Sequence, residues 1–266
     1  MTRPLRIMFH NPVGNGTYDG MFAEVLGRHL LPGTELHVTS LSPEEGAFQH
    51  IEYRAYEGRV TGGIVRASRA AAREGFDAFV IGCFYDTALH DAREVSGEMV
   101  VMAPCLAACE IASSLANRFG IIVGRRKWVA QMQATVHEYG YGPKLAGFYH
   151  VELGVTDFQK DHAETERRLI AAGRKAVEED FAEALILGCT LEIGFHKKVE
   201  KELGVPVIDP SIAALKRAEY AAVLRRDCGW VPSRRWSMEA PPEEEMARIG
   251  GFDVNRPFGN RVVVAA

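Results

Sequence analysis

The sequence has no excess of basic residues and no long apolar run. Its 31 Lys and Arg are outnumbered by 35 Asp and Glu, which gives a net charge of −4. This balance lacks the basic footprint of a nucleic-acid-binding protein. No stretch approaches the ~18 consecutive apolar residues of a membrane span, and residues 1–10 resemble a first strand rather than a signal peptide. We therefore expect a soluble protein with neither nucleic-acid nor membrane partners.

Cysteine is scarce, with five residues in a chain of 266. An odd number at irregular spacings does not make a disulfide framework, so we expect a reducing, cytoplasmic environment. No cluster of His and Cys has zinc-like spacing, and no metal is expected. Cys105 and Cys109 lie four residues apart among alanines and are interpreted as core residues, and Cys228 as incidental.

Nucleotide-binding signatures are also missing. Gly14-Asn15-Gly16 follows the first predicted strand, but the rest of a dinucleotide fingerprint is absent. No Lys-Ser/Thr pair completes a Walker motif. We therefore reject nucleotide chemistry and expect no cofactor.

The chain instead alternates short apolar segments with helical patterns. Strands are expected at 6–9, 36–40 and 148–153, and helices at 19–30, 57–75, 126–139, 161–180 and 211–226. Strands that alternate with helices of ten or more residues are typical of parallel βαβ units. The pattern predicts an α/β fold.

One unit of this pattern occurs twice. Residues 79–86, FVIGCFYD, align with residues 185–192, LILGCTLE, at an offset of 106, and the register continues to 102–108 and 208–214. Each copy contains an apolar strand, a Gly-Cys turn, a helix, a short strand and a helix led by proline. The duplication predicts two pseudo-symmetric lobes, each a mostly parallel sheet flanked by helices. Since α/β sheets bind ligands at the carboxyl ends of their strands, we expect the active site in the cleft between the lobes.

The repeat also sets the expected domain boundaries. Residues 1–115 form the amino-terminal lobe and residues 116–210 the second lobe. A helix over 211–229 returns to the first lobe. Residues 230–266, with Pro232, Pro241 and Pro242 and little periodicity, are interpreted as an irregular appendage.

The two Gly-Cys turns supply the candidate catalytic residues. A cysteine after a buried strand is usually a small core residue, but Cys83 and Cys189 occupy the same place in both copies. There the following helix directs its positive amino end at the sulfur, which favours thiolate. Two such thiols facing one another would make a two-base site.

Other repeated polar residues have structural interpretations. Asp86 and Glu192 follow the cysteines by three residues, where a carboxylate caps a helix. His90 and His196 follow by seven residues, about 10.5 Å along a helix, so neither need reach its thiol.

At these residues the chain resembles the aspartate/glutamate/hydantoin racemase superfamily over roughly residues 5–225. Gly188-Cys189-Thr190 is similar to the second cysteine motif of glutamate racemases. Asn11-Pro12, Gly82-Cys83-Phe84 and residues 204–209 resemble the hydantoin and allantoin racemase branch.

The resemblance implies a cofactor-independent isomerase, a racemase or epimerase acting on a small molecule, and a homo-oligomer. Cys83 and Cys189 are implied as catalytic residues: one thiolate removes a proton from the carbon next to a carbonyl, and the other thiol returns one to the opposite face. Backbone N–H groups at the Gly-Cys turns and near Asn11 are expected to hold the enolate. The implied substrate-binding residues are Asn11, Pro12, Phe84, Tyr85, Val123, Gly124, Thr190 and Leu191.

The chain departs from the amino-acid racemases of this group. They carry an acidic residue in the first strand loop and a histidine after Gly-Cys-Thr, where this chain has His10-Asn11-Pro12 and Leu191. A cyclic, imide-like substrate with a more acidic proton suits such a site better than an amino acid. The threonine pair common in the hydantoin branch is absent after Val123-Gly124-Arg125.

Two alternatives remain open at this stage. The same scaffold supports maleate-type cis-trans isomerases and arylmalonate decarboxylases, and the presence of both cysteines argues against the single-cysteine decarboxylase. A two-lobed, non-catalytic small-molecule binding protein is the second alternative. Alkylation of the cysteines distinguishes an enzyme from a binding protein. Only catalytic thiols should react with an alkylating agent near neutral pH and be protected from it by a bound ligand.

Overall fold

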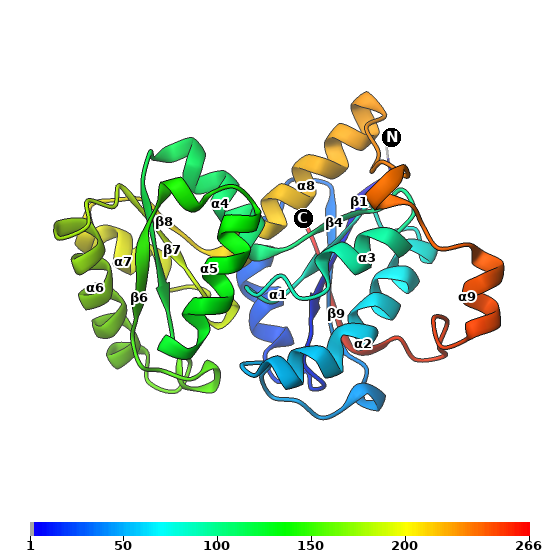
Figure 1. Ribbon diagram of the computed structural model, residues 1–266, viewed down its shortest axis with the longest axis horizontal. Coiled ribbons are helices and arrows are strands. Elements are labelled where there is room, and N and C mark those ends of the chain that lie inside the picture. Colours follow the sequence, from blue (N-terminus) through cyan, green and yellow to red (C-terminus); the bar gives the residue numbers. More distant parts are fainter. Residues whose placement is uncertain (1–2) are drawn as a thin grey trace. The chain divides into compact units, whose positions relative to one another are not determined.

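The computed structural model describes residues 3–266 and divides the chain into two compact units. Unit 1 comprises the chain up to Gly82, Thr87–Ala103 and Leu215–Ala266, and unit 2 comprises Cys83–Asp86 and Pro104–Ala214. Figure 1 shows that each unit contains its own sheet with helices packed against it. None of the helices in the described part of the chain is long and apolar enough to span a membrane.

The sheet of unit 1 has the strand order β4-β3-β1-β2-β9. Its strands are β1 (Leu5–Asn11), β2 (Thr34–Leu41), β3 (Ala78–Ile81), β4 (Val100–Met102) and β9 (Phe258–Ala265). The helices of this unit are α1 (Asp19–Gly27), α2 (Arg54–Arg73), α3 (Leu89–Val95), most of α8 (Pro210–Cys228) and α9 (Glu243–Ile249). The first four strands are parallel, and β9 is antiparallel to β2.

The sheet of unit 2 has the order β6-β5-β7-β8 and is parallel throughout. Its strands are β5 (Phe119–Val123), β6 (Leu145–His150), β7 (Ala184–Leu187) and β8 (Val207–Ile208). The helices are α4 (Pro104–Leu115), α5 (Val129–Glu138), α6 (His162–Glu178) and α7 (His196–Leu203).

The two sheets share one topology, which confirms the predicted duplication. The order β2-β1-β3-β4 of unit 1 is repeated in unit 2 as β6-β5-β7-β8. β3 and β7 are completely buried, as expected for strands covered on both faces and made only of apolar residues. α4 and α8 both begin at a proline, whose fixed φ suits the first helical position.

The helix α4 corrects the expected boundary between the lobes. Residues 104–115, expected in the first lobe, group with unit 2 in the structure. The buried face of α4, which includes Cys105, Ala108 and Ala112, packs against β7, β8 and α5. In α8, the residues from Leu215 onward group with unit 1, where Glu219 Oε1 accepts a hydrogen bond of 2.7 Å from the backbone N–H of Leu31.

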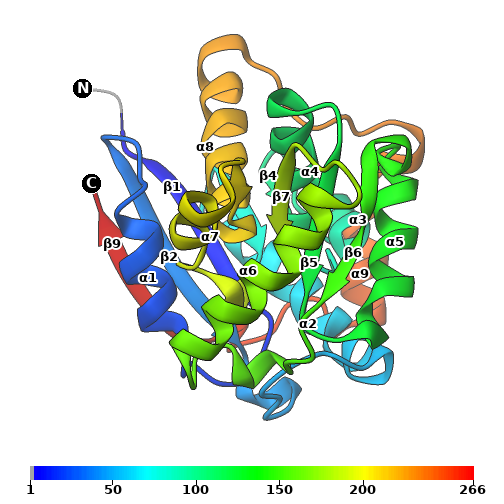
Figure 2. The same cartoon turned by 90° about the vertical axis from the view of Figure 1, so that its left-hand side faces the viewer.

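The prediction of an irregular appendage over residues 230–266 is wrong for its last part. Residues 258–265 form β9, which pairs with β2 of the same chain, and Figure 2 shows this strand in red beside β2. The strand is short and its partner lies more than 200 positions away, so the sequence does not show which segment it pairs with. The segment before β9 is held by Arg69, which is 4% exposed and donates hydrogen bonds to Glu243 and Asp253.

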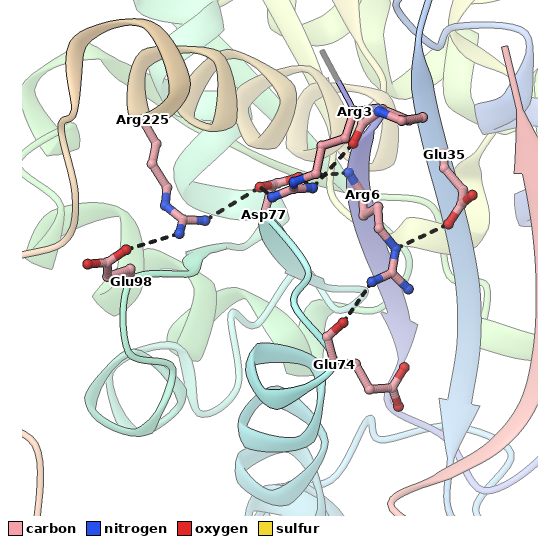
Figure 3. A network of polar contacts seen from close by, with 8 residues as sticks. Arg3, Arg6, Glu35, Glu74, Asp77, Glu98 and Arg225 are labelled. Carbon is pink, nitrogen blue, oxygen red and sulfur yellow. Dashed lines mark hydrogen bonds and ion pairs between the residues drawn. The ribbon is translucent and has the colours of Figure 1, made fainter. Parts of the chain in front are cut away.

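Charged residues join the amino-terminal ends of β1 and β3 (Figure 3). Asp77 accepts hydrogen bonds from the Arg3 guanidinium at 2.6 Å and from the Arg6 backbone N–H at 2.9 Å. Arg225 of α8 lies 3.5 Å from the same carboxylate and 3.0 Å from Glu98. Because these contacts precede β3 whereas Cys83 follows it, the network stabilises the scaffold at the end of the strands remote from the cysteine turn.

Candidate active site

The first cysteine turn begins where β3 ends. The backbone N–H of Gly82 donates to the carbonyl oxygen of His10 at 2.7 Å, which extends the pairing of β3 with β1. A Cβ atom at Gly82 would lie 2.8 Å from Phe9 and 2.9 Å from the His10 oxygen. The turn therefore requires glycine, and it leaves the following residue, Cys83, half-buried.

Asp86 ties this turn to two helices of unit 2. Its carboxylate accepts hydrogen bonds from the backbone N–H groups of Cys105 at 2.8 Å and Leu106 at 2.9 Å, at the start of α4. It also accepts one of 3.0 Å from the Tyr139 hydroxyl, which follows α5. Three donors and a helix amino terminus stabilise the charged carboxylate. Asp86 therefore caps a helix, but this helix is α4 and not the one that follows its own turn, which corrects the expectation.

The second cysteine turn repeats the first. The N–H of Gly188 donates to the Ile122 carbonyl oxygen at 2.6 Å, and a Cβ atom at Gly188 would lie 2.6 Å from that oxygen. Cys189 is 8% exposed. Its backbone N–H donates to Glu192 Oε2 at 3.2 Å, within a 3₁₀ turn over Thr190–Glu192.

These contacts narrow the choice of backbone donors for the expected enolate. The N–H groups of Gly82, Gly188 and Cys189 all donate to protein acceptors. The enolate-binding role stays a prediction for the other N–H groups of the turns and for those near Asn11.

The carboxyl groups at the two turns differ. At the amino end of α8, the N–H groups of Ser211 and Ile212 donate to Asp209 at 3.0 and 3.2 Å, as those of α4 donate to Asp86. Asp209 aligns with Ala103 in the repeat, so Glu192, the counterpart of Asp86, does not cap α8. Glu192 instead caps the 3₁₀ turn after Cys189, as expected from its spacing. Its Oε1 is buried without a hydrogen-bond partner among the described residues. Burial, with a smaller contribution from the Asp209 charge, raises the pKa of Glu192 well above its usual range.

This raised pKa predicts a pH-dependent stability that Glu192→Gln removes. The unfolded carboxyl loses its proton above about pH 4.5, whereas the folded one retains it, so the wild-type free energy of unfolding should fall as the pH rises from there. One such group contributes a slope of at most about 1.4 kcal/mol per pH unit. The glutamine side chain cannot ionise, and its oxygen can still accept the hydrogen bond from the Cys189 N–H. The free energy of unfolding of Glu192→Gln should therefore exceed that of the wild type by an amount that grows with pH. Urea unfolding from pH 4 to pH 9 measures the difference, with the exposed Glu239→Gln as control; parallel curves would contradict it.

The predicted substrate-binding residues fall into two sets. Asn11 ends β1 and Pro12 follows it, and both are buried, as are Phe84 and Tyr85 after Cys83. In unit 2, Val123 and Gly124 end β5, beside the Gly188–Ile122 hydrogen bond, and Thr190 and Leu191 are buried after Cys189. Each cysteine turn therefore follows a strand whose neighbour carries residues of the same set, at the ends where parallel sheets bind ligands.

Gly124 and Leu191 are fixed by their surroundings. A Cβ atom at Gly124 would lie 2.4 Å from both the Leu153 oxygen and the Trp128 ring. The Leu191 carbonyl accepts a hydrogen bond of 2.7 Å from Gln159. These contacts restrict the movement of the residues beside the second cysteine turn.

The remaining cysteines and histidines lie where a structural role places them. Cys105 and Cys109 are completely buried, and their mutual hydrogen bond, with burial, raises the pKa of Cys105 well above its usual range. No group of three metal-ligating side chains occurs within residues 3–266. His90 is exposed on α3, and His196 Nδ1 lies 3.6 Å from Asp209 Oδ2.

Two polar residues of this region were missed in the sequence. Asp19, at the start of α1, is completely buried and accepts a hydrogen bond of 3.0 Å from the Asn11 side chain. Tyr139 contacts Asp86 across 53 positions of sequence. The sequence showed only that Asp19 lies at the start of a predicted helix, where an aspartate usually caps the helix on the protein surface.

Comparisons with known proteins agree with this geometry. A family model described as Asp/Glu/Hydantoin racemase matches residues 10–218. The hydantoin racemase of Pseudomonas sp. (strain NS671) is 36% identical over 212 residues, which cover 80% of this chain and 83% of that protein. The hydantoin racemase of Paenarthrobacter aurescens is 31% identical over 242 residues, covering 91% and 99%.

The solved structures add the same fold. The allantoin racemase from Klebsiella pneumoniae superposes with a TM-score of 0.81 at 26% identity, covering 90% of this chain and 94% of that one. Because the family model spans most of the chain and the relatives align over nearly their whole lengths, the chain belongs to the Asp/Glu/hydantoin racemase family and is an isomerase of the racemase type.

Proposed function

We propose that this enzyme racemises a hydantoin-like cyclic amide without a cofactor, using Cys83 and Cys189 as opposed acid and base. The observation that carries the proposal is the repetition of one turn. Gly82 and Gly188 make the same backbone hydrogen bond to the neighbouring central strand, at 2.7 and 2.6 Å, and each is followed by a cysteine. A pair of equivalent thiols is what proton removal from one face and return to the other requires.

The reaction balances without an added reagent. One cysteine thiolate takes the proton from the stereogenic carbon, which leaves a planar enolate next to the carbonyl. The other cysteine, as a thiol, donates its proton to the opposite face and becomes the thiolate. A thiol pKa of about 8.5 lies close enough to neutrality for both roles. Both thiols must be reduced, as all five cysteines are in the structure, and we place the enzyme in the cytoplasm.

The substrate class follows from the residues beside the turns. By the resemblance, His10-Asn11-Pro12 and Leu191 stand where amino-acid racemases of the group carry an acidic residue and a histidine, and apolar side chains dominate both sets. The site is therefore better suited to a substrate whose proton is already acidified by a ring of amide groups. The relatives with the highest identity reported above act on hydantoins by name.

Polarimetry tests the proposal. Single enantiomers of 5-substituted hydantoins, allantoin, aspartate and glutamate are incubated with purified enzyme without cofactor. The rotation of a hydantoin or allantoin should decay to zero, and that of the amino acids should persist. Decay with the amino acids alone would refute the substrate class. If no optical rotation decays while maleate is converted to fumarate, the hypothesis of a cis-trans isomerase replaces that of a racemase.

A further inference from the structure

We propose that Asn260, on the C-terminal strand β9, is a positioning residue of the active site, which acts on substrate binding through Asp19 and Asn11. The inference rests on the proposed function for its kinetic consequence. Asn260 lies outside residues 10–218, the part of the chain that the family model matches. It gives the C-terminal segment a role in the reaction.

The three side chains form a continuous chain of hydrogen bonds within unit 1. Asn260 Nδ2 donates to Asp19 Oδ2 at 3.3 Å, and Asn11 Nδ2 donates to Asp19 Oδ1 at 3.0 Å. Burial raises the pKa of Asp19, and the hydrogen bonds from Asn11, Asn260 and Ser40 oppose that rise. Each carboxylate oxygen thus receives an amide donor, and the loss of either removes one of the hydrogen bonds that stabilise this buried group.

The backbone of β9 is shaped to deliver this contact. The pairing of β2 with β9 is irregular between Thr39 and Leu41, and the Asn260 N–H donates instead to the Ser40 hydroxyl at 2.8 Å. Such irregularities turn a side chain out of the regular ladder. The neighbouring Gly259 permits the approach, because a Cβ atom there would lie 2.7 Å from the Leu41 oxygen.

Asn260 also packs closely against the start of α1. A Cβ atom at Gly16, just before α1, would lie 2.8 Å from Asn260 Cβ and 3.1 Å from Asp19 Oδ2. Phe258 is buried with its ring centroid 6.2 Å from that of His10, the residue before Asn11. Arg261 forms two hydrogen bonds with Glu74, at 2.8 and 2.9 Å. The end of the chain is therefore fixed on both sides of Asn260.

The consequence for the substrate comes from the orientation of the Asn11 amide. A carboxylate only accepts hydrogen bonds, so Asp19 fixes the amide with its nitrogen inward. The amide oxygen is then the group that Asn11 presents away from Asp19. An acceptor there suits a ring N–H of a hydantoin-like substrate and not a carboxylate. Asn260 therefore helps to select substrates that carry an N–H donor.

Kinetics of a mutant cycle test the proposal. Because Asn260 is otherwise exposed, Asn260→Ala should fold normally. It should lower kcat/KM about tenfold, mainly through KM, which corresponds to the loss of one hydrogen bond. In an Asn11→Ala background the same change should have no further effect, because Asn260 acts through Asn11. Val263→Thr, an exposed position on the same strand, should match the wild type.

A second variant separates positioning from a general loss of structure. Asn260→Asp keeps the shape of the side chain but places a second carboxylate against Asp19, and the two negative charges repel each other. The kcat/KM of this variant should be low at neutral pH and should recover as the pH falls and one of the two carboxylates is protonated. Asp19 of α1 is the carboxyl group that contacts this position. The His10 ring of β1 lies beside Phe258, two residues before Asn260, and burial lowers the pKa of His10 to about 3. The recovery is therefore assigned to the carboxylates.

An activity-independent readout keeps the proposal distinct from the proposed function. The side-chain amide signal of Asn11 in a ¹⁵N–¹H spectrum should shift in Asn260→Ala and stay in place in Val263→Thr. An unshifted signal, a wild-type kcat/KM or effects that multiply in the double variant would each overturn the inference. If the wild-type enzyme racemises nothing while the signal shifts, it is the proposed function that fails.

Discussion

Alanine at either Cys83 or Cys189 is expected to reduce racemisation by at least about a thousandfold. General acid–base groups contribute about 10²–10⁴-fold to a rate, and a two-base reaction loses one of its two proton transfers completely. The fold should survive, because Cys83 is half-buried in a turn and Cys189 lies in the turn two residues after β7 ends. The initial rate of optical rotation decay measures the loss.

Cys228→Ala is the matched control, since this thiol is exposed at the end of α8 and should leave the rate unchanged. Circular dichroism shows whether each variant is folded. If a folded Cys83→Ala or Cys189→Ala enzyme racemises at the wild-type rate, the two-cysteine mechanism is excluded.

Gly188→Ala is the second large effect. The added Cβ would lie 2.6 Å from both the Ile122 oxygen and Val123 Cγ1, and Ile122 belongs to the central strand β5. Neither backbone can yield without breaking the 2.6 Å hydrogen bond between them. Overpacking of this kind costs about 1–3 kcal/mol of stability. A displacement of Cys189 by about 1 Å should also lower kcat/KM about a hundredfold.

Denaturant unfolding and kcat/KM should be measured together for this variant. Gly58→Ala is the control, because a Cβ atom at that position of α2 meets nothing within 4 Å. Alanine is the better helix former by about 1 kcal/mol, so the control should be slightly more stable and fully active. Wild-type activity in Gly188→Ala would show that the position of the second turn is not critical.

The duplicated α/β fold could be predicted because the repeat is local and sequential. The apolar segments around Cys83 and Cys189 align without a gap, and an identical strand order follows from repeating the same βαβ units. Both Gly-Cys turns appear where they were expected, after β3 and β7. Short-range patterns of this kind are the ones that a sequence displays.

The contacts between distant segments could not be predicted. β9 pairs with β2, and Asn260 reaches Asp19 across 241 positions, and no local pattern identifies the partner in either contact. The exchange of capping roles between Asp86 and Asp209 is visible only when hydrogen-bond partners are known. The same holds for the unsatisfied carboxyl of Glu192 beside Cys189.

Proton NMR in D₂O at early turnover tests the two-base account most directly. A single enantiomer of a 5-substituted hydantoin is incubated with the wild-type enzyme, and the α-proton of each enantiomer is followed after chiral separation, with the spontaneous exchange subtracted. The account predicts that the product carries deuterium from the opposite cysteine while the remaining substrate keeps its proton. A product that retains the original proton, or a substrate that exchanges as fast as product forms, would indicate one shared base and contradict the account.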